Sequence, residues 1–173
     1  ISIIALLGTG MGYLIHRNWR NRRRFEELMV RDAAKPTVTK SDDRLASHEI
    51  NPEIEQSILR KLEQFEGGGR YLQKDMNLAR LAKICNSNTK YVTWTIARHR
   101  RKGTIEYITD LKIAYIMEKL KTDGRYRNYT NRALAEEAGF GSAQHFTRAF
   151  KERNGISPTY FIGRLKKALD VPD

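Results

Sequence analysis

The 173-residue sequence is poor in cysteine, the residue that cross-links many small domains, and contains only one, Cys85. A single thiol excludes an internal disulfide framework and any zinc site that needs two or more thiolates. With 12 glycines, 4 prolines, 30% charged and 40% hydrophobic residues, collagen-like and fully disordered chains are excluded as well. These exclusions leave a packed globular chain, whose C-terminal side we expect to face a reducing compartment.

Groups that carry common catalytic chemistry are also missing. The four histidines, His16, His48, His99 and His145, are scattered along the chain and show no metal-ligand spacing. The sequence has neither a phosphate-binding loop nor a Gly-x-Ser-x-Gly elbow, and the Gly67–Gly69 run is better explained as a connector. We therefore expect a protein that is not an enzyme and that uses no metal ion and no cofactor.

Basic residues are in clear excess, with 32 Lys and Arg against 20 Asp and Glu, which gives a formal net charge of +12. Most of this excess lies beyond Asn51, so it is not confined to a terminal tail. A strongly basic domain indicates a polyanionic partner, either nucleic acid or an anionic membrane surface. Charge alone does not separate these two partners from an ordinary soluble protein that happens to be basic.

The first 31 residues combine an apolar run with a basic cluster. Ile1–Ile15 contains no charged residue, and Trp19 and several arginines follow it. A spanning helix needs roughly 20 apolar residues, so residues 1–31 predict a truncated transmembrane helix with a basic juxtamembrane helix. A signal-peptide core or a buried helix of an upstream domain is the alternative. The positive-inside rule places the chain beyond residue 31 in the cytoplasm, attached to the bacterial inner membrane.

A polar segment and a capped helix come next. Residues 32–50 have a linker composition with few apolar residues. A helix is predicted to begin at Asn51-Pro52-Glu53, because Asn caps helices and Pro is favoured in the first turn. Apolar residues then recur at helical spacing, namely Ile54, Ile58, Leu62 and Phe65. The rest of the chain has no useful strand-like alternation, so residues 51–173 are predicted to form an all-α domain.

Within this domain, residues 77–86 resemble residues 130–139. Each segment begins with a helix-capping residue, contains Leu-Ala, and ends with Asn86 or Gly139, types that tolerate a left-handed backbone. A short helix followed by such a turn and a second helix is a helix-turn-helix.

The second helices are predicted near residues 89–98 and 142–153. Their buried pairs would be Val92 with Ile96 and Phe146 with Phe150. We thus predict two helix-turn-helix units, residues 77–103 and 130–162, with two plain helical hairpins as the alternative. A long linker helix is predicted between them from a broad apolar set, Tyr107, Ile108, Leu111, Ile113, Ala114, Met117 and Leu120.

The second unit carries a specific motif. It consists of a Gly-Phe turn at Gly139, an aromatic–x–Arg–x–aromatic–Lys run from Phe146 to Lys151, and Gly-x-Ser-Pro from Gly155 to Pro158. This pattern resembles the DNA-binding domain of the AraC-type transcription regulators over about residues 77–164. The resemblance implies a double helix-turn-helix fold and sequence-specific binding of double-stranded DNA.

The chain also departs from the family pattern. Phe161-Ile162 stands where the family usually has Tyr-Arg, and Lys112 replaces an Arg of the middle helix. Four further differences lie in the first unit. Asn86 and Arg101 stand where the family pattern has Gly, Ser87 stands where it has Phe, and Thr104 stands where it has a Pro-like residue.

A recognition helix presents side chains to base edges, while flanking polar and basic groups contact phosphates. The residues predicted to contact bases are Lys90, Tyr91, Thr93, Trp94, Ala143, Gln144, Thr147 and Arg148. The residues predicted to contact phosphates are Thr89, Arg98, Arg100, Arg101, Lys102, His145, Lys151 and Arg153. Two alternatives stay open: Trp94 as a core residue, which would shift the first register, and His145 as an ordinary half-exposed helix residue.

The sequence therefore predicts a membrane-linked, sequence-specific transcription regulator. Its expected partners are double-stranded DNA and, through residues 1–31, a membrane. RNA polymerase and a second copy of the chain are further candidate partners. The alternative is a basic membrane-surface scaffold or interaction protein without sequence-specific DNA binding.

Overall fold

The structure is a computed structural model that describes residues 50–169. These residues form seven α-helices and two short 3₁₀ helices, and none of them is in a strand, which confirms the predicted all-α class for this range. The predicted membrane segment 1–31 and almost all of the linker 32–50 lie outside the described residues. Within residues 50–169, no helix has the length and apolarity required to cross a bilayer.

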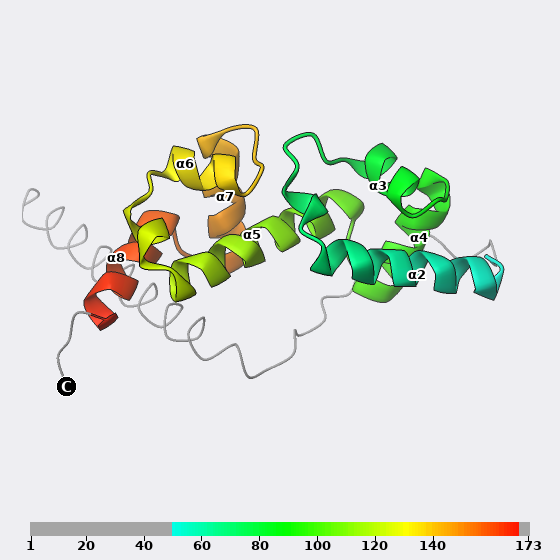
Figure 1. The fold of residues 1–173 in the computed structure, drawn as a ribbon, viewed down its shortest axis with the longest axis horizontal. Helices are drawn as coiled ribbons and strands as arrows, with labels where there is room; N and C mark the ends of the chain where they lie inside the picture. Colours follow the sequence, from blue (N-terminus) through cyan, green and yellow to red (C-terminus); the bar gives the residue numbers. More distant parts are fainter. Residues whose placement is uncertain (1–49, 170–173) are drawn as a thin grey trace, which may run out of the picture. The chain divides into compact units, whose positions relative to one another are not determined.

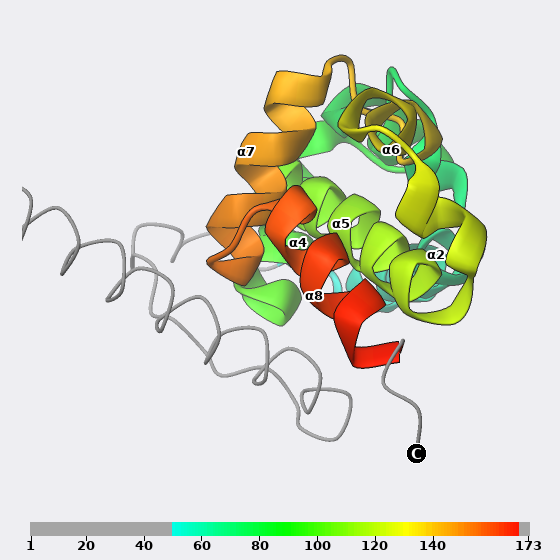
Figure 2. The ribbon, with the colours of Figure 1, turned by 90° about the vertical axis from the view of Figure 1, so that its left-hand side faces the viewer.

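The described residues fall into two parts, residues 50–149 and 150–169, which are considered separately. The first part contains α2 (Pro52–Gly67), η2 (Arg70–Leu72), α3 (Leu78–Ile84), α4 (Thr89–Arg100), α5 (Thr104–Thr122), η3 (Gly124–Asn128) and α6 (Asn131–Glu137) (Figure 1). Helix α7 (Ala143–Asn154) begins in the first part and ends in the second, which also contains α8 (Pro158–Leu169). Figures 1 and 2 show α6 above the C-terminal part of α5.

Side-chain caps fix the helix starts that the sequence predicts. Asn51 accepts a hydrogen bond from the Glu53 amide at 2.9 Å at the start of α2. The two short helices begin alike, since Asn77 and Thr130 each accept from an amide three residues on, both at 3.1 Å. Asn88 and Ser142 do the same for α4 and α7. Each cap satisfies one of the amides that a first helical turn leaves without a partner.

The predicted left-handed turns are also present. Asn86 has φ +51° and Gly139 has φ +69°, at matching places between the two helices of each unit. A second matching pair follows the second helices, where Arg101 has φ +53° and Gly155 has φ +74°. Gly139 is buried, and a Cβ atom built on it would lie 1.7 Å from the Leu72 carbonyl oxygen. Gly139 is thus required both by its backbone conformation and by the close approach of another backbone.

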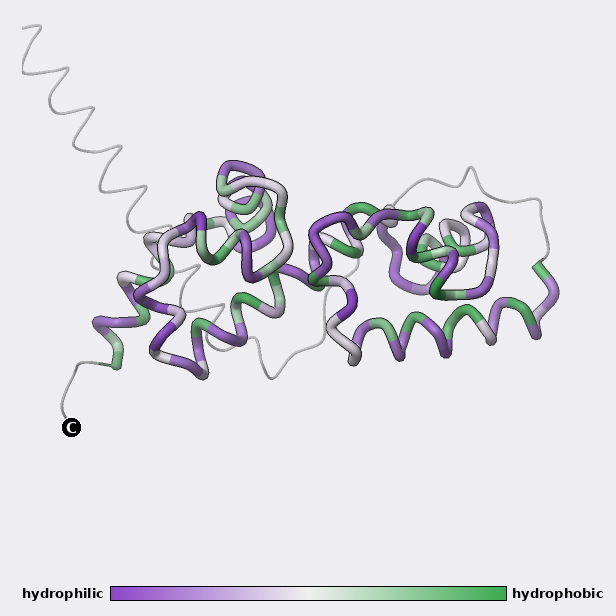
Figure 3. Tube along the Cα trace, turned by 45° about the horizontal axis from the view of Figure 1, so that its top comes forward, coloured by the Kyte–Doolittle hydropathy of each residue, from purple (hydrophilic) through white to green (hydrophobic). Residues whose placement is uncertain are grey.

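A hydrophobic core joins α2, α3, α4 and the start of α5. Its buried members come from all four helices, and they are Ile58, Leu62, Phe65, Met76, Leu81, Ala82, Cys85, Val92, Ile96, Tyr107 and Ile108. Hydrophobic and hydrophilic positions alternate along α2 at the helical period, as Figure 3 shows. The predicted pair Val92 and Ile96 is fully buried, and so is the pair Phe146 and Phe150 in α7.

Only some of the apolar residues predicted for the linker helix are buried in α5. Tyr107, Ile108, Ile113 and Leu120 are buried as expected, whereas Leu111 and Met117 are half-buried. The expectation that Ala114 lies in the apolar set is wrong, because Ala114 is exposed and Ile116 is buried instead. Residues two apart on a helix point to nearly opposite sides, so Ile116 and Ala114 cannot share one face.

Residues 150–169 form a helix end, a turn and α8. Asn154 donates a hydrogen bond to the Phe150 carbonyl at 3.0 Å, and Gly155 then reverses the chain in the left-handed conformation. The Ser157 hydroxyl accepts from the Tyr160 amide at 3.2 Å, which caps α8. The Phe150 and Phe161 rings pack with their centroids 6.0 Å apart.

Gly139→Ala is expected to lower the free energy of unfolding by about 3 kcal/mol or more, since overpacking and left-handed strain act together. Thermal or urea denaturation followed by circular dichroism measures the change. Gly163→Ala is the matched control, because a Cβ there meets nothing within 4 Å and the residue is helical. The control should leave stability unchanged or raise it slightly, and equal effects of the two changes would contradict the argument.

Cys85 makes stability sensitive to alkaline pH. Burial raises the pKa of this thiol to about 11. Between about pH 9 and 11 the unfolded chain loses the thiol proton while the folded chain retains it, so rising pH favours unfolding by up to about 2–3 kcal/mol. Urea titrations at pH 8 and pH 10.5 test this. In Cys85→Ala the alkaline loss should be smaller, and an identical pH dependence would exclude the thiol as its cause.

Candidate nucleic-acid interface

The first helix-turn-helix consists of α3, the turn around Asn86, and α4. Along α4, Val92, Thr95 and Ile96 are buried against the core, while Lys90 is exposed. The buried Thr95 hydroxyl donates to the Tyr91 carbonyl at 2.8 Å, so its polar group is satisfied. Of the other predicted base-contacting residues of this helix, Thr93 and Trp94 are half-buried, and Tyr91 is half-buried and packs against the core.

Trp94 is half-buried rather than part of the core. The Arg98 guanidinium lies over the Trp94 ring, 4.8 Å from the ring centroid. This stacking lets Arg98 cover one face of the indole while both residues stay at the surface. Trp94 is therefore not a member of the core cluster, and the register of α4 on DNA stays a prediction.

The second helix-turn-helix consists of α6, the turn at Gly139, and α7. Gln144, His145 and Arg148 are exposed, and Ala143 and Thr147 are half-buried. Phe146 is fully buried and Ala149 is 6% exposed, so the two sides of the helix are well separated. The His145 ring packs edge-on against Phe140 at 5.2 Å, which orients the imidazole at the start of α7.

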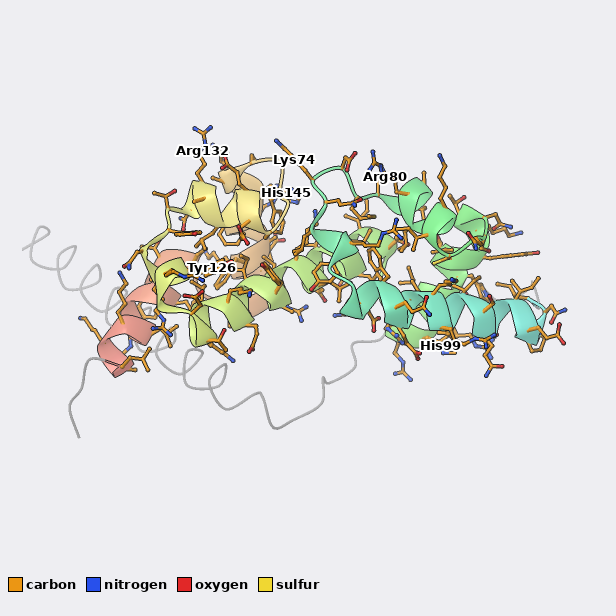
Figure 4. All side chains as sticks on the ribbon, viewed as in Figure 1. Lys74, Arg80, His99, Tyr126, Arg132 and His145 are labelled. Atoms are coloured by element: carbon orange, nitrogen blue, oxygen red, sulfur yellow. The ribbon has the colours of Figure 1, made fainter. Side chains whose placement is uncertain are left out.

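The basic cluster at the C-terminal end of α4 is largely paired with carboxylates. Arg98 and His99 contact Glu55 of α2, with Arg98 Nε 3.7 Å from Glu55 Oε1. Lys102 forms an ion pair with Asp110 of α5. Figure 4 shows His99 beside α2 and shows Arg132 projecting outward from α6.

Arg100 is held by Glu66 at the other end of α2. Arg100 Nε donates to Glu66 Oε1 at 2.9 Å, and the Tyr107 hydroxyl donates to the same oxygen at 2.8 Å. The hydrogen bond that Arg100 donates to Glu66 raises the pKa of Arg100, and burial, followed by the hydrogen bond to the same carboxylate, raises the pKa of Tyr107. Arg98, Arg100 and Lys102 were predicted to contact phosphates, and the structure engages all three within the fold.

Other predicted phosphate contacts remain open to solvent. Thr89, Arg101 and Lys151 are exposed, and Arg153 is half-buried with an interaction of its own. Within residues 50–169, no group of three or more His, Cys, Asp or Glu side chains is placed to hold a metal ion. The exposed side chains of α4 and α7 thus include cations, an amide and a hydroxyl, which are groups that can bond to base edges and phosphate oxygens, and one carboxylate, Glu152.

Lys112 has a role that the sequence analysis missed. Its side chain is 6% exposed, and its ammonium donates to the Gly139 carbonyl at 2.6 Å and to the Gln73 carbonyl at 3.2 Å. The same ammonium lies 5.5 Å from the centre of the Phe140 ring. Burial lowers the pKa of Lys112, and the nearby Asp75 partly opposes this. The sequence does contain a signal, because Lys112 interrupts an i, i+4 apolar stripe between Ile108 and Ile116.

Residues 132–170 match the family model of bacterial regulatory helix-turn-helix proteins, AraC family. No curated protein matches the chain. The match covers most of α6 and all of α7 and α8, so this segment is similar to the helix-turn-helix of that family.

Solved structures of the same fold extend the likeness over most of the described residues. The C-terminal domain of AraT, a response regulator from Geobacillus stearothermophilus, is 19% identical with a TM-score of 0.51, covering 68% of this chain and 88% of that one. The C-terminal domain of the two-component response regulator yesN from Fusobacterium nucleatum is 18% identical with a TM-score of 0.52, covering 60% and 97%. An AraC-type transcriptional regulator from Chromobacterium violaceum is 11% identical with a TM-score of 0.53, covering 66% and 96%. The described residues therefore share the fold of these proteins, with two helix-turn-helix units and a connecting helix.

Proposed function

We propose that this chain is a transcription regulator that binds a specific DNA sequence with α4 and α7 in successive major grooves, about 34 Å apart. The AraC-type match and the shared fold support a DNA-binding regulator. The observation that carries the finer proposal is the two-sided character of α7, where Gln144 and Arg148 are exposed and Phe146 is fully buried. Gln pairs with adenine and Arg with guanine in the major groove.

The base-contacting set proposed for α4 is Lys90, Tyr91, Thr93 and Trp94, and the set for α7 is Ala143, Gln144, Thr147 and Arg148. Thr89, Arg101, His145, Lys151 and Arg153 are proposed to contact phosphates. Arg98, Arg100 and Lys102 are weaker candidates, because their carboxylate partners would have to be exchanged for phosphate.

Selection of bound oligonucleotides from a random pool by the full chain tests the proposal directly. A regulator of this kind enriches a bipartite sequence motif, and its binding weakens steeply with added salt. Enrichment of no motif, together with tight binding to anionic vesicles, would favour the surface scaffold instead.

We also infer membrane attachment through residues 1–31, a linker over residues 32–50 and a DNA-binding domain over residues 51–173. This rests on the apolar run Ile1–Ile15 and the arginines that follow it. Fractionation of the tagged full chain, with and without residues 1–24, tests the attachment. Equal recovery of both forms in the membrane fraction would contradict it.

Arg148→Ala is expected to relax discrimination at one base pair by about 1–3 kcal/mol. Binding to the selected site and to its single-base variants measures this. The matched control is Arg60→Ala, which removes the same charge from an exposed position on α2. The control should change affinity little, and an equal loss on all sequences for Arg148→Ala would contradict direct base contact.

Arg101→Gly should separate binding from stability. The substitution relieves the strain of a side chain in the left-handed conformation, but glycine also gives the unfolded chain more conformational entropy. The net effect is expected to raise the free energy of unfolding by about 0.5–1 kcal/mol. Loss of a phosphate contact should weaken binding to all sequences alike and reduce the salt slope by about 1. Denaturation and salt titrations measure the two effects, and unchanged affinity would remove Arg101 from the interface.

A further inference from the structure

The segment that leads into the first helix-turn-helix unit meets the turn of the second unit at a small joint within residues 50–149. One side is the end of η2 and the residue after it, which supply the carbonyls of Leu72 and Gln73, and the other is the turn at Gly139. Figure 1 shows these two segments close together above α5. Gly139 begins the turn that leads directly into α7, so any movement at the joint would move the second recognition helix.

Two independent contacts hold this joint. The first is steric, because the Gly139 backbone approaches Leu72 so closely that no side chain fits between them. The second is the Lys112 ammonium, which donates to one carbonyl on each side, at 2.6 Å to Gly139 and 3.2 Å to Gln73. Lys112 belongs to α5, so both segments are fixed to the helix that connects the two units.

The joint resists opening because separation would leave a buried cation without partners. With 6% of its residue surface exposed, Lys112 depends on these carbonyls and on the Phe140 ring for the interactions that water would otherwise provide. A hydrogen-bonded cation of this kind gives a defined geometry, whereas an apolar contact at the same place would tolerate sliding.

We propose that Lys112 is a positioning residue that locks the second helix-turn-helix unit against the first, so that the chain accepts DNA half-sites at one spacing only. The inference rests on the proposed DNA-binding function for its consequence, but the lock itself is a property of the protein alone. Lys112 acts through the positions of α4 and α7 and touches no DNA in this account.

A first experiment measures the lock without DNA. Two exposed residues, Lys83 on α3 and Arg132 on α6, are replaced by cysteine in a Cys85→Ala variant, and a nitroxide label is attached to each. The distribution of distances between the two labels is measured by pulsed electron paramagnetic resonance. The distribution should be narrow with Lys112, at least twofold broader in Lys112→Met, and narrow again in Lys112→Arg, which retains a cation. A broad distribution with Lys112 present would overturn the proposal.

A second experiment measures the consequence on DNA. One to five base pairs are inserted between the halves of the selected site, and the affinity at each spacing is compared with that of the original site. Insertion of a few base pairs should lower the affinity of the unaltered chain at least tenfold. The same insertion should lower the affinity of Lys112→Met by a factor at least five times smaller, and Lys112→Arg should show the spacing preference of the unaltered chain. Equal affinity of the unaltered chain at all spacings would overturn the proposal even if Lys112→Met failed to fold.

Ile116→Ala is the matched control, because Ile116 is fully buried on the same helix and is not one of the joint contacts. It should lower the melting temperature while leaving the distance distribution and the spacing preference unchanged. Broadening in Ile116→Ala equal to that in Lys112→Met would assign the effect to general destabilisation. A chain that binds no DNA sequence selectively would refute the proposed function, while the label distances would still test the lock.

Discussion

A buried ammonium group costs free energy unless hydrogen bonds replace the water that it has lost. Lys112 meets this constraint with two backbone carbonyls from segments far apart in the sequence, Gln73 and Gly139. The constraint therefore fixes three things at once, namely α5, the segment after η2 and the turn that leads into α7. An exposed lysine would impose none of this, because its ammonium would remain hydrated and its side chain mobile.

Crowding at the same joint explains why the two units use different residues in equivalent turns. Asn86 and Gly139 both adopt the left-handed conformation, which Asn tolerates better than most residues that have a side chain. Gly139 is buried and lies against the Leu72 carbonyl, so a side chain is excluded there. Asn86 is exposed, so conformation alone decides its identity. The looser motif of the first unit thus reflects a less crowded turn rather than a different fold.

Much of the local structure could be predicted from the sequence, because capping residues, turn residues and apolar spacing act over a few residues. Asn51, Asn77 and Thr130 cap the helices that their types predict. The long-range contacts could not be predicted, since Arg100 meets Glu66 across 34 residues only after α2 and α4 have packed. Ala114 was misplaced for a related reason, because the apolar set of α5 was broad and only packing shows which side is covered.

These ion pairs change what the number of basic residues says about DNA. The 32 Lys and Arg residues include Arg98, Arg100 and Lys102, whose side chains are paired with Glu55, Glu66 and Asp110 in the fold. A cation that keeps its carboxylate attracts a phosphate less, because the pair is nearly neutral at a distance. The field that a duplex meets would therefore come chiefly from exposed groups such as Lys90, Arg101 and Arg148. Since each neutralised phosphate releases counterions, the salt slope of binding measures how many cations are free to act, and it should be smaller than the basic content of the chain implies.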